Sequence, residues 1–144
     1  MMNKSAWGEN MPTSYKIFKE IGLVIVTCSG PANPEETIAV VTRLQADPEF
    51  SLSYDVLWDA RERTVPFTSD ETMKIARYVG SYKGDKRSKR ALLVSKDVNY
   101  GMARVYESLR YSKSHVEIEI FKDWEEALKW LGLYDHPLFH SNKS

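Results

Sequence analysis

Two adjacent hydroxyl residues, Thr68 and Ser69, stand where the sequence predicts the first turn of a helix. Such a position favours an added phosphate, because it carries free backbone N–H groups and the positive end of the helix dipole. However, Asp70 and Glu71 follow directly and would repel a phosphate. The Thr-x-x-Glu spacing also predicts an ordinary capping box. Two interpretations therefore stand: a phosphorylation switch at Thr68 or Ser69, or a plain helix cap.

A ligand pocket is a second candidate, beneath the third predicted helix. Gly101 lies in its first turn and costs stability relative to alanine, which a hinge or a close backbone approach would explain. Met102 offers an adaptable apolar surface, and Tyr100 and Tyr106 can place hydroxyls at a pocket mouth. Asp59 ends a predicted parallel strand, where α/β ligand sites gather, although it could equally cap the next loop. The alternative is that Gly101 only relieves crowding against the sheet.

A basic stretch at residues 83–90 is a third candidate. Its cationic members are Lys83, Lys86, Arg87, Lys89 and Arg90. They could contact an anionic surface such as lipid headgroups. A solvated loop that complements the negative end of the preceding helix dipole explains the same composition.

The other reactive residues do not form a catalytic pattern. Cys28 is the only cysteine, and its apolar run predicts a small buried residue rather than a nucleophile. The three histidines have no metal-ligand spacing with it. A Gly-rich phosphate loop, a nucleophile elbow and paired carboxylates on one buried face are all lacking from the sequence. We therefore expect no catalytic residue, no metal and no cofactor, and a protein that is not an enzyme.

The composition is that of a globular domain. The 144 residues are 42% hydrophobic and 28% charged, and 20 basic residues balance 20 acidic ones. Without a basic excess, little drives non-specific nucleic-acid binding. The first residues are polar and the longest aliphatic run, residues 23–26, is too short to cross a membrane. With a single cysteine, these features predict a cytoplasmic protein without a transmembrane segment.

The elements that must position these residues alternate between strand and helix. Strands are expected at residues 15–20, 23–28, 56–59, 91–94 and 116–121, with a loop at 61–67. Expected N-caps of the four helices are Asn33, Thr68, Asp97 and Asp123. The order ββαβαβαβα predicts an α/β fold with one five-stranded, mostly parallel sheet and an antiparallel first strand. The second and fourth strands, being continuously apolar, should be interior. The domain should span 14–133, with flexible tails at 1–13 and 134–144.

Three strings carry a resemblance to a known family: residues 56–59 (VLWD), 100–104 (YGMAR) and 121–131 (FKDWEEALKWL). With the element order, they resemble the SpoIIAA-like group of the STAS and Sec14-like superfamily. STAS antagonists carry a phosphorylatable serine at the start of the second helix, where this chain has Thr68 and Ser69. Sec14-like relatives hold lipids beneath a movable helix. The resemblance thus implies a non-enzymatic regulatory or protein-interaction module. The alternative is a carrier or sensor of a small apolar or lipid-like ligand. Such a carrier could act at the membrane surface.

Separately, the four tryptophans and eight tyrosines are more than a small core needs, and a few of them could form a homo-oligomer contact.

Overall fold

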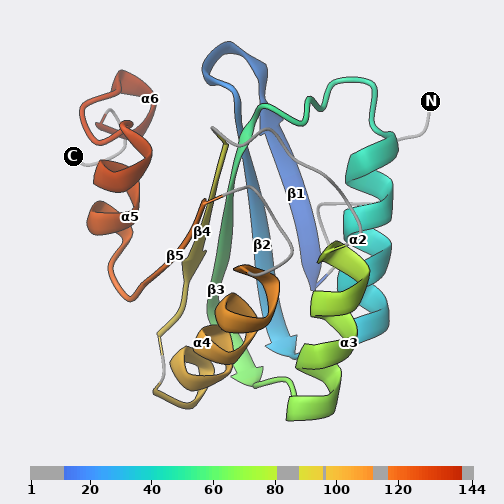
Figure 1. Cartoon of the computed structure of the whole chain (residues 1–144). Helices are drawn as coiled ribbons and strands as arrows, with labels where there is room; N and C mark the ends of the chain where they lie inside the picture. Colours follow the sequence, from blue (N-terminus) through green and yellow to red (C-terminus); the bar gives the residue numbers. More distant parts are fainter. Residues whose placement is uncertain (1–11, 81–87, 96, 112–116, 141–144) are drawn as a thin grey trace.

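A single five-stranded sheet forms the centre of the computed structural model, which describes residues 12–80, 88–95, 97–111 and 117–140 (Figure 1). Its strands are β1 Thr13–Phe18, β2 Leu23–Pro31, β3 Asp55–Val65, β4 Lys89–Leu93 and β5 Glu117–Phe121. They lie in the order β1-β2-β3-β4-β5, with β1 antiparallel to β2 and every other pair parallel. The predicted fold class and the interior positions of β2 and β4 are confirmed.

The apolar sequence of β2 is explained by burial on both faces of the sheet. Leu23 packs into one core cluster, with Leu57 and Leu131, while Val24 packs into a second cluster on the opposite face. Both side chains are fully buried. Because successive strand residues point to opposite faces, a strand covered on both sides is apolar at consecutive positions, as β2 is from Leu23 to Val26.

The helices cover the two faces unequally (Figure 1). Three helices lie on one face: α2 Pro34–Ala46, α3 Ser69–Gly80 and α4 Asp97–Tyr111. Two lie on the other: α5 Trp124–Leu131 and α6 Pro137–His140. The strand order explains this layout, because β2 to β5 advance in one direction. Right-handed crossovers then place every connecting helix on the same face.

Local signals set several helix ends as predicted. The Asn33 side chain accepts a 3.1 Å hydrogen bond from the backbone N–H of Glu36, and α2 stops before Asp47. Gly132 ends α5 in the left-handed conformation, with a φ of 77°. Asp123 is a correction: it occupies the N-cap of α5, but its side chain makes no capping hydrogen bond.

The third strand is longer than the sequence predicts. The predicted loop at residues 61–67 is largely strand, since β3 continues to Val65 beside β2. Thr27 pairs with Asp59 but Ser29 pairs with Glu62, so β3 carries one extra residue between these pairs. Such a bulge breaks the alternation from which strands are recognised, which is why the continuation was missed.

Regular elements extend beyond both ends of the predicted 14–133 range. The first strand begins at Thr13, which is fully buried, and ends at Phe18, where a short 3-10 helix (η1, Lys19–Ile21) follows. The predicted tail from residue 134 instead contains α6, whose Phe139 packs edge-on against Trp124 with the ring centroids 6.0 Å apart. Aromatic packing thus holds the chain against α5 through residue 139.

Candidate ligand-binding pocket

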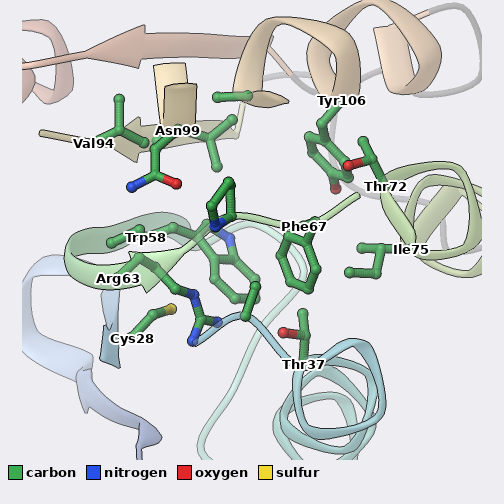
Figure 2. A pocket seen from close by; sticks show the side chains of 15 residues that line it. Cys28, Thr37, Trp58, Arg63, Phe67, Thr72, Ile75, Val94, Asn99 and Tyr106 are labelled. Carbon is green, nitrogen blue, oxygen red and sulfur yellow. The ribbon is translucent and has the colours of Figure 1, made fainter. Parts of the chain in front are cut away.

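A pocket of about 120 Å³ lies between the sheet and helices α2, α3 and α4 (Figure 2). Its wall is almost entirely apolar. The strands contribute Cys28, Trp58 and Leu92, and the helices contribute Thr37, Ile75 and Tyr106. The pocket is therefore built from segments far apart in the sequence.

Its position follows from the topology of the sheet. Trp58 and Ala60 lie toward the carboxyl end of β3, and Val94 directly follows β4. Ala32 and Phe67 come from the connections that leave β2 and β3 for their helices. In parallel sheets these connections diverge at the carboxyl edge and leave a crevice, which is where α/β proteins bind ligands.

Arg63 is the charged residue of the pocket wall. It follows the bulge in β3 and only 6% of its surface is exposed. Its Nη1 donates hydrogen bonds to the carbonyl oxygens of Ser29 (3.1 Å) and Pro31 (3.3 Å), which ties the bulged end of β2 to β3. Its guanidinium carbon also lies 5.6 Å from the centroid of the Phe67 ring. The Nη1 atom of Arg63 thus holds β2 and β3 together, while the side chain also borders the pocket.

Two further polar side chains border the pocket without hydrogen-bond partners in the described structure. These are the hydroxyl of Thr37 on α2 and the amide nitrogen of Asn99 on α4. Both residues are buried. Buried polar atoms are nearly always paired, and an unpaired one costs about 1–3 kcal/mol. The pocket wall thus includes two residues whose buried polar atoms have no partner among the described residues.

Cys28 borders the same pocket as a neutral thiol. Burial raises its pKa to about 11, an effect that exceeds the opposing influence of the Arg63 charge. A thiol with this pKa carries almost no thiolate near neutral pH, so it is a poor nucleophile. Its contribution to the pocket is apolar surface.

Of the five residues predicted to form a pocket, the structure describes the side-chain surroundings of four. Tyr106 borders the observed pocket. Asp59 does not: its carboxylate holds Arg61 at 2.9 and 2.8 Å. The Tyr100 ring lies 4.6 Å from the ammonium of Lys122.

Gly101 and Met102 complete that set. Gly101 is exposed, and a Cβ built there would meet no atom within 4 Å, so it neither relieves crowding nor approaches the sheet closely. The side chain of Met102 lies outside what the structure describes. Only Tyr106 of the predicted set is thus placed at the pocket.

The candidate switch residues lie beside the pocket. Thr68 and Ser69 are exposed. The Thr68 hydroxyl accepts from the N–H of Glu71 at 3.2 Å, and the Glu71 carboxylate accepts from the N–H of Thr68 at 2.9 Å. This is the predicted capping box in full. Because Phe67 borders the pocket, the start of α3 is directly connected to its wall.

The basic candidates are only partly described. Lys83, Lys86 and Arg87 lie outside the described residues. Lys89 donates to the carbonyl of Trp130 at 2.8 Å, and Arg90 donates to the carbonyl of Tyr54 at 3.0 Å. They are consecutive residues of β4, so their side chains leave opposite faces of the sheet. Lys89 and Arg90 therefore bind neighbouring segments on opposite faces of the sheet, and an anionic-surface contact by the basic stretch stays a prediction.

Sequence reasoning missed three of the polar residues that border the pocket: Arg63, Thr37 and Asn99. Arg63 fell in the predicted loop. Thr37 and Asn99 are polar residues in amphipathic helices, where a solvated position is the usual expectation. A signal existed for both helix residues: Thr37 shares a helix face with Val41 and Leu44, and Asn99 shares one with Ala103 and Tyr106.

The described ranges contain neither a metal-ligand group nor a membrane-spanning helix. There, no three His, Cys, Asp or Glu residues are grouped so that they could hold a metal ion. No described helix has the length and apolar character needed to cross a bilayer.

In comparisons with known proteins, no protein-family model and no curated protein matches the chain.

Proposed function

We propose that this chain is a binding module for a small, mostly apolar ligand, acting as its carrier or sensor. One observation carries the proposal: an apolar pocket at the carboxyl edge of the parallel strands, bordered by buried polar atoms without partners. Pockets with a mainly apolar wall and a few convergent polar groups are the usual form of small-molecule sites. The polar groups then orient a ligand whose apolar part provides most of the contact.

The volume of the pocket limits the size of the ligand. At about 120 Å³ it is somewhat smaller than the engineered cavity of about 150 Å³ that binds benzene. An apolar group of about the size of one ring therefore fits. A whole lipid would have to leave most of its chain outside, so the size favours a small ligand over the lipid-like one.

Neutral apolar probes test this function directly. Toluene and benzene should bind the full chain saturably, as measured by ligand-observed NMR. Ala103→Leu should abolish binding, because Ala103 borders the pocket and the larger side chain fills it. Ala39→Leu is the matched control, since Ala39 is exposed on α2. Equal binding by Ala103→Leu and wild type would show that the ligand lies elsewhere.

A regulatory or interaction module is the second candidate. The exposed pair Thr68 and Ser69 supports it, because the residue before the pair borders the pocket. Negative charge at this helix start could then alter the pocket wall. Under this proposal Ser69→Asp or Thr68→Glu changes toluene affinity, whereas wild-type affinity in both variants would contradict a switch here.

Membership of the SpoIIAA-like group remains a proposal. The element order ββαβαβαβα and the antiparallel first strand support it. In that framework the pocket is a site for a small apolar effector rather than an active centre.

A further inference from the structure

The charge of Arg63 is the feature of the pocket that most needs a partner. Guanidinium stays protonated at any pH a folded protein meets, so Arg63 carries its charge into an almost wholly buried position. Burying a charge is costly unless it is paired. Two carbonyl oxygens and the face of Phe67 compensate part of this cost.

No carboxylate of the described residues forms an ion pair with Arg63. Glu62, the residue before Arg63 in β3, is exposed and forms no ion pair with it in the described structure, and Asp59 in the same strand is bound to Arg61. Glu36 accepts a hydrogen bond from Thr13 at 3.2 Å instead. The positive charge on the pocket wall therefore lacks a neutralising anion within the described chain.

The unpaired hydroxyl of Thr37 adds to this arrangement. In Figure 2 the guanidinium of Arg63 and the hydroxyl of Thr37 are turned toward the same end of the pocket. Both can donate a hydrogen bond to one acceptor group. Asn99 reaches the pocket from α4 and offers a further unpaired N–H donor. The pocket thus presents several donors and one positive charge within an otherwise apolar wall.

We infer that the pocket binds a small monocarboxylic acid with an apolar body of about one ring or one short branched chain. The carboxylate lies toward Arg63 and Thr37, and the apolar body lies against Trp58 and Ile75. This inference rests on the proposed function and names its ligand class. It accounts for both the apolar wall and the uncompensated cation.

A carboxylate fits this site better than a phosphate does. Its planar pair of oxygens matches the guanidinium fork, and its single negative charge matches the single positive one. A phosphate monoester carries up to two negative charges at neutral pH and has three oxygens to satisfy. In an apolar pocket with one cation, the second charge would be buried without a partner.

The experiment compares benzoate with benzamide and with toluene on the full chain, by calorimetry or ligand-observed NMR. Benzoate should bind at least about tenfold tighter than either neutral probe, because hydrogen bonds to a charged group are stronger. Phenyl phosphate is the anionic comparison and should bind more weakly than benzoate. Tighter binding of phenyl phosphate would overturn the carboxylate assignment.

Variants of two arginines test whether the carboxylate of bound benzoate lies beside Arg63. Arg63→Met should lower benzoate affinity by at least about 30-fold and leave toluene binding in place. Arg61→Met is the matched control, because Arg61 is exposed and pairs with Asp59 away from the pocket, and it should leave benzoate affinity unchanged.

Thr37→Val keeps the test valid if Arg63→Met does not fold, because the deleted hydroxyl has no partner among the described residues. It should lower the affinity for benzoate about fivefold and leave the affinity for toluene unchanged. Equal binding of benzoate and toluene by the wild type would overturn the inference and leave the proposed function standing. Failure of all the probes to bind folded protein would overturn both.

Discussion

The guanidinium carbon of Arg63 lies 5.6 Å from the centroid of the Phe67 ring, so the buried cation of the pocket and the residue before the α3 cap are in contact. A cation over an aromatic face is stabilised by the ring quadrupole. The contact links β3 with the start of α3. The pocket wall and the start of α3 are therefore connected through one side-chain pair.

Replacing Phe67 tests that pair. Phe67→Leu keeps an apolar side chain but removes the ring, and should lower the free energy of unfolding by about 0.5–1 kcal/mol. Phe67→Tyr keeps the ring and should stay close to wild type. Urea denaturation measures both variants, and equal losses would show that the ring face contributes nothing.

Gly101 is predicted to be replaceable with a gain in stability. It is exposed in α4 and a Cβ there meets no atom, so Gly101→Ala should raise the free energy of unfolding by up to about 1 kcal/mol. Gly132→Ala is the matched control, because a φ of 77° at the end of α5 disfavours alanine. It should destabilise the protein by about 1 kcal/mol. A destabilised Gly101→Ala would instead favour a hinge in α4.

Of the two candidate switch residues, only Thr68 takes part in the capping box, so the two should differ in their effect on stability. Thr68→Ala removes the side-chain acceptor for the N–H of Glu71 and should cost about 1 kcal/mol in thermal or urea unfolding. Ser69→Ala should change stability by less than about 0.5 kcal/mol, because surface substitutions away from caps are nearly neutral. A similar cost at both positions would mean that Ser69 has a structural role that its exposure does not indicate.

The Tyr15–Asp47 hydrogen bond should make stability depend on pH in the alkaline range. The Tyr15 hydroxyl donates to Asp47 Oδ2 at 2.8 Å, and burial together with this bond raises the pKa of Tyr15 well above its usual value of 10.0. Above pH 10 the unfolded chain loses this proton while the folded chain keeps it. The unfolded state then binds fewer protons, so the free energy of unfolding falls as pH rises.

Tyr15→Phe isolates this contribution. The variant should be about 1–2 kcal/mol less stable than wild type at pH 8, where the hydrogen bond is intact. The difference should narrow as pH rises from 10 to 11. Cys28, whose pKa is raised to about 11, also destabilises the fold in this range, but it does so equally in both proteins. A difference that stays constant to pH 11 would contradict the raised pKa.

The sequence by itself determined the features that depend on local chemistry. Asn33 and Thr68 cap their helices because a short polar side chain reaches N–H groups only three residues away. Gly132 ends α5 because glycine tolerates a positive φ. The unbroken apolar run of β2 indicated a strand covered on both faces, and with it the interior of a mostly parallel sheet.

Only the tertiary structure decided the pocket. Strict alternation from Trp58 and Ala60 would turn Glu62 toward α2 and α3, but the extra residue in β3 turns Arg63 there instead. This bulge is stabilised by long-range bonds, among them those from Arg63 to the carbonyls of Ser29 and Pro31. A one-residue shift in register thus exchanges an acid for a base on the pocket wall. The bulge cannot be predicted from local sequence spacing, because the hydrogen bonds that stabilise it join residues more than 30 positions apart.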